Sequence, residues 1–209
     1  MINKKLLIIF IKNEEEGKVK TRLAKTLGDK KALEIYQRLL DKTKEVALQL
    51  TEVDKALYYS GFIADNDRWP TEHFDKKLQH QGSLGERMSA AFTEGFEKGY
   101  QQICIIGSDC WDLDTQRLQE AFDALENNNF VAGAANDGGY YLLGMSYFLN
   151  ALFQGKTFST SSVYHEAITE IKKTGDPYKE LDILTDIDNE EDLKQTSLWE
   201  ELFNTAKFQ

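Results

Sequence analysis

Three cations and a glycine lie close together near the start of the chain, in the segment Gly17–Leu23. They follow the continuous apolar run Leu6–Ile11, which is typical of a strand covered on both faces. Backbone N–H groups at the start of a helix, with the side chains of Lys20 and Arg22, suit the binding of a polyphosphate. The alternative is a solvated basic turn. The segment is not a P-loop, because the Gly-x-x-x-x-Gly-Lys-Ser/Thr pattern is absent.

A second candidate segment, Gln81–Met88, combines two glycines with polar side chains. Gly82 and Gly85 would let the backbone approach a planar or charged ligand closely. Gln81 is then a candidate to read the edge of a base, and Arg87 a candidate to bind a phosphate. The simpler interpretation is a turn followed by a serine that caps a helix.

A third candidate segment, Asn136–Tyr141, contains a glycine pair between polar residues. Gly138 and Gly139 fit a plain hairpin turn. They would equally bring the backbone against a ligand, with Asp137 and Tyr140 supplying polar contacts.

Acidic residues follow two of the apolar runs. Asp109 comes just after the run Ile103–Ile106, where a Mg²⁺ or Mn²⁺ ion would bridge a carboxylate and phosphate oxygens. Its alternative role is to cap the next helix. Asp186 and Asp188 resemble the start of a calcium loop, but Glu191 occupies the position where that loop requires glycine. Either Asp188 or the asparagine after it could cap a helix, which leaves Asp186 for a metal.

Apolar runs and amphipathic stretches alternate along the chain, and they predict strands and helices in turn. The predicted strands are Leu6–Ile11, Val53–Ser60, Ile103–Ile106, Phe130–Ala134, Gly138–Met145 (a strand or hairpin arm) and Leu181–Leu184. The predicted helices are Asp29–Leu50, Leu84–Phe96, Leu118–Leu125, Ser161–Lys173 and Glu190–Leu202. This order predicts an α/β fold with a mostly parallel central sheet, helices on both faces, and a single domain over residues 1–209.

Ligands of such sheets bind beyond the carboxyl ends of the strands, where the strand order reverses. We therefore expect the loops Lys12–Leu23, Gly107–Asp114 and Ala135–Gly139 to lie near one another. Asp109 should lie on the same rim of the sheet as Lys20 and Arg22.

The charge balance limits the partners that the chain would bind. The formal net charge is −10, from 25 Lys and Arg against 35 Asp and Glu, which disfavours nucleic acid and anionic membranes. The first apolar run is too short for a membrane span or a signal segment. Cys104 and Cys110 form no Cys-x-x-Cys pair, a pattern that suits a reducing compartment. We expect a cytoplasmic protein.

Taken in order, five motifs resemble one family: Lys-Thr-Arg-Leu, Leu-Gly-Glu-Arg-Met, Gly-Ser-Asp-Cys, Asp-Gly-Gly-Tyr-Tyr and Asp-Ile-Asp-x-x-Glu-Asp-Leu. It is the bacterial glycosyltransferase family that is labelled radical-SAM/selenodomain-associated or arsenosugar-biosynthesis-related. The resemblance runs from Lys4 to about Leu193. It implies membership of the nucleotide-diphospho-sugar transferase superfamily, with its Rossmann-like GT-A fold, to which guanylyltransferases also belong.

The resemblance also implies roles for individual residues. It assigns Lys20 and Arg22 to the nucleotide phosphates and Asp109 to the metal, with Asp186 or Asp188 completing the metal site. Gln81 and Gly85 would lie near the base, and Asp137 with the two glycines after it would face the acceptor or sugar.

Three positions depart from the family pattern, and each changes a loop. Trp111 stands where the family has proline after Gly-Ser-Asp-Cys, and Gly133 stands where it has another proline. The loop after the first strand carries Glu14–Glu16 in place of a proline. Three carboxylates would repel a phosphate unless they point to solvent.

These residues suit transfer from a nucleotide-activated donor to a small-molecule acceptor. A metal and two cations would stabilise the negative charge that builds on phosphate oxygens. The histidines lie outside every motif, which points to direct attack by the acceptor. Glycosyl transfer from a nucleotide sugar is the first hypothesis, nucleotidyl transfer from a nucleoside triphosphate is the second, and a non-catalytic nucleotide-binding protein is the third.

Overall fold

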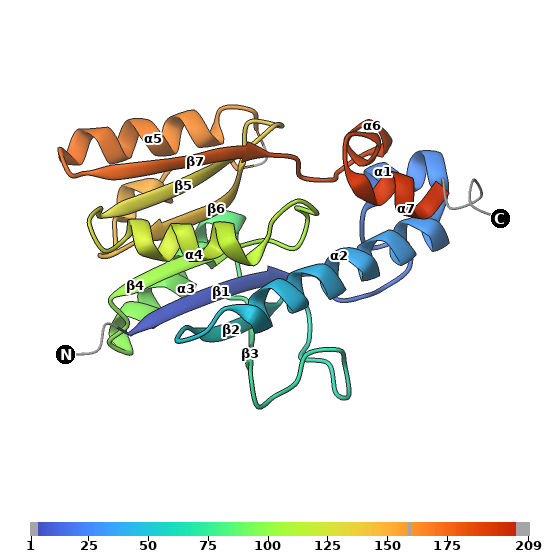
Figure 1. The fold of residues 1–209 in the computed structure, drawn as a ribbon, viewed down its shortest axis with the longest axis horizontal. Helices are drawn as coiled ribbons and strands as arrows, with labels where there is room; N and C mark the ends of the chain where they lie inside the picture. Colours follow the sequence, from blue (N-terminus) through green and yellow to red (C-terminus); the bar gives the residue numbers. More distant parts are fainter. Residues whose placement is uncertain (1–3, 159, 204–209) are drawn as a thin grey trace.

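A single sheet runs through the residues that the computed structural model describes, 4–158 and 160–203 (Figure 1). Its strands are β1 (Lys5–Ile11), β2 (Asp54–Tyr59), β3 (Asp75–Leu78), β4 (Gln102–Ile106), β5 (Phe130–Ala135), β6 (Tyr140–Met145) and β7 (Tyr178–Leu184). They are arranged in the order β3-β2-β1-β4-β6-β5-β7. Every neighbouring pair is parallel except the two pairs of β6, which runs antiparallel to β4 and β5.

Helices cover both faces of this sheet. The helices of the described residues are α1 (Thr21–Leu27), α2 (Asp29–Gln49), α3 (Leu84–Glu97), α4 (Thr115–Ala124), α5 (Val163–Thr174), α6 (Glu190–Lys194), α7 (Ser197–Phe203) and the 3-10 helix η1 (Asn150–Leu152). One hydrophobic core lies between the sheet and α2 and α4, and a second lies between the sheet and α3 and α5 (Figure 1). Along β1, Leu7 and Ile9 enter the first core, while Leu6 and Ile8 enter the second.

A third, smaller hydrophobic cluster lies beyond the carboxyl ends of the strands. Helices α1, α6 and α7 gather there, beside the first turns of α2 (Figure 1). The buried residues of this cluster are Leu23, Ile35, Leu39, Ile187, Leu193 and Leu198. Because Leu23 and Ile187 share it, the segments after β1 and β7 meet although they come from opposite ends of the chain.

The predicted α/β fold is confirmed, and the differences from prediction have simple causes. The strand β3 was not predicted, since its sequence Asp-Lys-Lys-Leu lacks an apolar run and only β2 pairs with it. The predicted helix Glu190–Leu202 is two helices, α6 and α7, separated at Gln195–Thr196. The segment Gly138–Met145, predicted as a strand or hairpin arm, is a strand, β6, which begins at Tyr140 and runs antiparallel to both of its neighbours.

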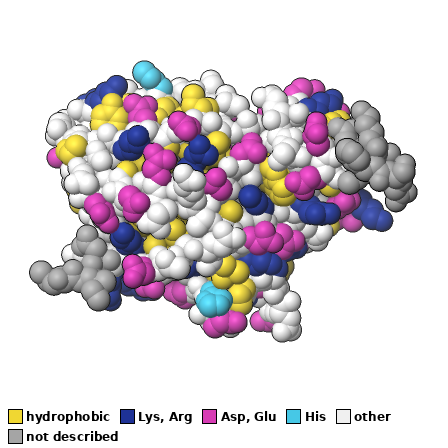
Figure 2. Space-filling view, viewed as in Figure 1, with side chains coloured by type: hydrophobic (Ala, Val, Ile, Leu, Met, Phe, Trp, Pro, Cys, Tyr) yellow, Lys and Arg dark blue, Asp and Glu magenta, His cyan; other side chains and the backbone are white. Residues whose placement is uncertain are grey.

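Charged side chains of both signs are interspersed over the face shown in Figure 2. Within the described ranges, no helix has both the length and the apolar character that a membrane crossing requires.

Candidate active site

The centre of the candidate site is the side chain of Lys20, which is only 4% exposed. Its Nζ donates to the backbone oxygen of Ile187 at 2.6 Å and lies 2.7 Å from Asp109 Oδ1 and 4.0 Å from Asp188 Oδ1. Lys20 itself adopts the left-handed conformation, with φ 47°, directly before α1. A non-glycine residue in that conformation is strained, and such strain is concentrated at functional sites.

Asp109 reaches this place because it follows the central strand β4, which is the parallel neighbour of β1. Its backbone oxygen accepts a hydrogen bond from Ile187 N at 2.9 Å, and the next residue, Cys110, forms a β-bridge with Asp186. Asp109 does not cap the following helix, because the side chain of Asp114 does so. The Asp109 carboxylate, 40% exposed, instead lies at the carboxyl rim of the sheet, where it pairs with Lys20.

Asp188 joins the same group from the segment after β7. Its Oδ2 lies 3.1 Å from Arg22 Nη1, and the Arg22 side chain is 66% exposed. The asparagine Asn189, not Asp188, caps α6 through a capping box with Asp192. The sequence thus brings Lys20, Arg22, Asp109 and Asp188 together at one rim, as the topology predicts.

Negative charge is crowded at this rim. Desolvation, together with the neighbouring carboxylates of Asp109, Asp137 and Asp188, raises the pKa of Asp186 to about 7, although Lys20 opposes the rise. The carboxylates of Asp109 and Asp188 lie within 4.0 Å of the buried Lys20 ammonium group, and the Asp186 side chain lies close enough to interact with it electrostatically. Such a group of hard oxygen atoms attracts cations.

The carboxylate oxygens of this rim are suitable ligands for a hard divalent cation. Their arrangement does not form a complete metal site from protein atoms alone. Among the described residues, no three His, Cys, Asp or Glu side chains are placed to hold an ion together. Mg²⁺ is commonly held by one or two carboxylates and completed by substrate phosphates and water. The residues therefore suit an ion that arrives with a phosphate-bearing ligand.

The chain itself fills the space beside two glycines that were candidates to face a ligand. A Cβ atom at Gly85 would lie 2.3 Å from the Phe158 ring, and one at Gly138 would lie 2.1 Å from the backbone oxygen of Ser161. Both neighbours come from the segment between η1 and α5. These two glycines therefore allow close packing of that segment, whatever else they contact.

Replacing Gly138 with alanine should lower the free energy of unfolding by about 2 kcal/mol. Its φ of 88° is unfavourable for alanine, and the added Cβ would clash with the backbone of Ser161. Gly155 is the matched control, since its φ is also positive, at 66°, while nothing lies within 4 Å of its Cβ position. Gly155→Ala should cost about 1 kcal/mol, the conformational part alone. Equal losses in urea denaturation would show that the Ser161 contact contributes nothing.

The other candidates in the third segment make local contacts. Asp137 Oδ1 accepts a hydrogen bond from Gly139 N at 2.8 Å, which closes the turn before β6. The hydroxyl of Tyr140 lies 3.8 Å from Met88 Sδ, and burial raises the pKa of Tyr140. Asp137 is exposed to solvent, while the ring of Tyr140 packs toward α3.

The second segment forms the start of α3, and its Arg87 contacts Gln79, a residue outside the segment that sequence reasoning missed. Ser83 caps the helix in a capping box, as the simpler interpretation proposes, and Gly82 turns the chain there with φ 121°. The guanidinium of Arg87 donates to Gln79 Oε1 at 2.7 Å. Gln79 is buried and donates to two strand-end carbonyls. Gln79 follows the exposed strand β3, whose sequence has no apolar pattern, so no sequence pattern indicated this role.

Three of the unusual loop residues contact other side chains of the chain. Glu14 pairs with Arg68 at 2.6 Å, and Glu15 pairs with Lys18 at 2.7 Å. Trp111 donates through Nε1 to Ser197 Oγ at 2.8 Å. Two of the three carboxylates are thus held by cations.

A family model described as "Uncharacterized protein conserved in bacteria (DUF2064)" matches residues 43–160. The chain belongs to the DUF2064 family. The matched span of this DUF2064 protein contains Asp109 and Asp137, while Lys20 and Asp188 lie outside it. A search of curated proteins finds no significant match.

Solved structures resemble this DUF2064 chain over almost its whole length. A "putative nucleotide-diphospho-sugar transferase" from Desulfovibrio desulfuricans G20 is 28% identical, with a TM-score of 0.84, covering 97% of this chain and 89% of that one. Rv0371c of Mycobacterium tuberculosis H37Rv, in complex with manganese, is 13% identical, with a TM-score of 0.52 and coverage of 92% and 97%. A CMP:2-keto-3-deoxy-manno-octonic acid synthetase complexed with CTP is 8% identical, with a TM-score of 0.54 and coverage of 92% and 96%. The last two show the shared fold.

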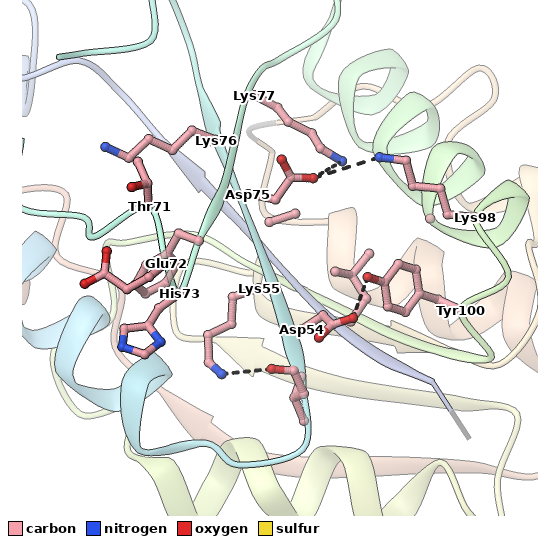
Figure 3. Close-up of a pocket in the computed structure, with 15 residues that line it drawn as sticks. Asp54, Lys55, Thr71, Glu72, His73, Asp75, Lys76, Lys77, Lys98 and Tyr100 are labelled. Atoms are coloured by element: carbon pink, nitrogen blue, oxygen red, sulfur yellow. Dashed lines mark hydrogen bonds and ion pairs between the residues drawn. The ribbon is translucent and has the colours of Figure 1, made fainter. Parts of the chain in front are cut away.

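A cavity of about 650 Å³ in the DUF2064 chain lies at the opposite rim, by the amino ends of β2 and β3 (Figure 3). Lys77 and Lys98 point there toward Asp75 (Figure 3). Lys55 donates to the backbone oxygens of Leu50 and Val53. Its cations are therefore occupied by the chain's own acceptors. The cavity is separate from the rim that carries Lys20 and Asp109.

Proposed function

We propose that this DUF2064 protein is a transferase that uses a nucleotide-activated donor, most simply a nucleoside-diphosphate sugar, and a small-molecule acceptor. The observation that carries the proposal is the contact of Lys20 with Asp109 and the segment after β7. It joins three candidate segments at the carboxyl rim, where α/β sheets bind ligands. The relative from Desulfovibrio desulfuricans, described as a nucleotide-diphospho-sugar transferase, supports the same reaction class.

In this proposal the exposed guanidinium of Arg22 binds the donor phosphates, since a guanidinium can donate two parallel hydrogen bonds to them. Asp109, with Asp186 or Asp188, would hold a Mg²⁺ or Mn²⁺ ion, which supplies charge stabilisation to the departing phosphate. The manganese complex of Rv0371c supports a divalent ion in this fold. Lys20 keeps the carboxylate of Asp109 in place.

The acceptor would approach from the turn before β6. Asp137 is exposed there, and its carboxylate contributes to the raised pKa of Asp186, which supports placing this turn at the same rim. A carboxylate beside the acceptor hydroxyl could take its proton during direct attack on the donor. Gly138 and Gly139 would position the backbone of this turn.

Nucleotidyl transfer is the second candidate, and the CTP-bound synthetase of the same fold favours it. Glycosyl transfer releases a nucleoside diphosphate from a nucleotide sugar, while nucleotidyl transfer releases pyrophosphate from a nucleoside triphosphate. A thermal-shift panel of nucleotides and nucleotide sugars with Mg²⁺ or Mn²⁺ would find the donor, because a ligand at a hundred-fold excess over its Kd stabilises the native state by about 2.7 kcal/mol. The radical-SAM/selenodomain and arsenosugar-biosynthesis associations of the resembled family stay predictions for this chain.

Replacing Arg22 with alanine should weaken nucleotide binding by about 1.5–3 kcal/mol, the range of charge-assisted hydrogen bonds. The free energy of unfolding should change by less than about 1 kcal/mol, since the side chain is 66% exposed and its pair with Asp188 is a surface pair. Titration calorimetry of the variant beside Lys25→Ala, an exposed lysine on the same helix, checks this. Equal affinities for both variants would restore the solvated-turn interpretation.

A further inference from the structure

The backbone of Lys12 lies just beyond the paired part of β1. The register of β1 with β4 ends at Ile9 and Ile106, and its register with β2 ends at Ile11 and Tyr59. In the described sheet, the N–H and C=O groups of Lys12 therefore have no strand partner. Backbone polar groups that leave a sheet beside a packed helix need hydrogen bonds from another element.

A single hydroxyl, that of Tyr36 in α2, serves both groups. It accepts a hydrogen bond from Lys12 N at 2.8 Å and donates one to Lys12 O at 3.0 Å. A hydroxyl has one proton and two lone pairs, so one acceptor position remains. Ser108 Oγ donates to it at 3.5 Å. Tyr36, only 2% exposed, thus joins the loop after β1 to the loop after β4.

This contact lies next to the candidate metal ligand Asp109. Ser108 is 4% exposed and directly precedes Asp109 in the chain. Burial and, after it, the charge of Asp109 raise the pKa of the Tyr36 hydroxyl. The hydroxyl therefore stays protonated close to that carboxylate, and its proton remains available for Lys12 O.

Two contacts thus join the same pair of loops. The Tyr36 hydroxyl joins them at Lys12 and Ser108, beside the ends of the strands. The Lys20 ammonium group joins them at Asp109, one residue farther along the second loop. Because Ser108 and Asp109 are adjacent, a shift of the backbone at Ser108 also displaces the Asp109 carboxylate.

Helix α2 gives Tyr36 a fixed position. Tyr36 and Leu40 enter the first core, whereas Ile35 and Leu39 of the same helix enter the third hydrophobic cluster. The helix is therefore packed on two sides at the level of Tyr36, and the ring cannot follow a displaced loop. A side chain that packing locks in this way can hold functional groups in one geometry.

We propose that Tyr36 is a positioning residue of the candidate site, whose hydroxyl holds the loops after β1 and β4 at the separation at which Asp109 meets Lys20 and a metal ion. This rests on the proposed function. Tyr36 touches neither the donor nor the metal, and it acts through Ser108 and the backbone of Lys12. Such an indirect role has a large effect, because a displacement of about 1 Å in a site can lower a rate about 10²-fold.

The test compares wild type, Tyr36→Phe and Ser108→Ala for binding of the di- and triphosphates of the four common ribonucleosides, each with Mg²⁺ and with a chelator. Tyr36→Phe keeps the ring in the first core and removes only the hydroxyl. It should reduce the enhancement of affinity by Mg²⁺ at least about three-fold, within the range for the loss of one hydrogen bond. Ser108→Ala leaves Lys12 bonded and should reduce the enhancement in the same direction. Affinity with the chelator should stay unchanged, because the third hydrophobic cluster holds the helix of Arg22.

Tyr58→Phe is the matched control for loss of a buried hydroxyl. Tyr58 is 3% exposed, and its hydroxyl donates to Glu94 Oε2 at 2.8 Å. This contact belongs to the second core, on the other face of the sheet. Tyr58→Phe should lower stability and leave the Mg²⁺ enhancement unchanged, so it separates positioning from a general loss of stability.

A second measurement tests the same contact without any ligand. Urea denaturation of Tyr36→Phe, Lys20→Met and the double variant should give losses of stability that do not add, because both side chains join the same two loops. The losses of Tyr58→Phe and Lys20→Met should add, since these residues contact different elements.

Unchanged Mg²⁺ enhancement in both Tyr36→Phe and Ser108→Ala, with nucleotide binding intact in wild type, overturns the positioning role and leaves the proposed function standing. An equal reduction in Tyr58→Phe also overturns it, because any loss of stability would then have the same effect. So does a urea cycle in which the losses of Tyr36→Phe and Lys20→Met add. If wild type binds none of the nucleotides, the proposed function falls, and the role of Tyr36 in metal binding falls with it.

Discussion

Replacing Lys20 with methionine is expected to lower the free energy of unfolding by about 3 kcal/mol. The substitution leaves the backbone oxygen of Ile187 without its donor and removes a nearly buried partner of Asp109. The full cost of breaking a buried ion pair, about 3–5 kcal/mol, is reduced because Asp109 is 40% exposed and can be solvated. Urea denaturation measures the change.

The matched control for this variant is Lys25→Met, on the same helix and exposed to solvent. Its free energy of unfolding should change by no more than about 0.5 kcal/mol. Lys20→Met should also lose donor turnover, since Asp109 is no longer held. Equal stability of the two variants would mean that Lys20 does not tie the loop after β1 to the segment after β7.

Replacing Asp109 with asparagine is expected to abolish the metal-dependent tightening of nucleotide binding and to lower turnover roughly 10²–10³-fold, as the loss of one charge-stabilising group does. The asparagine side chain keeps the shape and still offers an oxygen to Lys20, so the fold should persist. Nucleotide affinity without metal should survive or improve, because one negative charge beside the phosphates is removed.

Asp123→Asn, an exposed carboxylate on α4, is the control and should match wild type in both measurements. If the metal still enhances nucleotide binding in Asp109→Asn, then other carboxylates, those of Asp186 or Asp188, bind the metal. A far-ultraviolet circular dichroism spectrum would reveal any loss of folding. It therefore separates a structural effect of the substitution from a catalytic one.

The fold was predictable wherever the burial of an element leaves a recognisable pattern of apolar residues in its sequence. The run Leu6–Ile11 is apolar throughout because both faces of β1 are covered, and the same holds for Ile103–Ile106 in β4. The strand Asp75–Leu78 lies at the edge of the sheet, where only one neighbour constrains it and charged residues are tolerated. Its sequence therefore carried no strand signal.

The convergence of candidate residues was predictable from topology, and their detailed contacts were not. Parallel strands deliver Asp109 and the loop after β1 to one rim, so their proximity follows from strand order alone. Burial of Lys20 depends on the third hydrophobic cluster, which joins segments from opposite ends of the chain. The packing of Phe158 on Gly85 likewise depends on a tertiary contact between distant segments.

The measurement that tests the central proposal most directly is a calorimetric titration of the wild-type protein. Nucleoside triphosphates and nucleotide sugars would each be titrated with Mg²⁺, with Mn²⁺ and with a chelator. We predict that at least one of them binds, and that a divalent ion tightens this binding ten-fold or more, about 1.4 kcal/mol. Binding that is indifferent to the metal, or no binding of any nucleotide, would contradict a metal-assisted transferase site at Lys20 and Asp109.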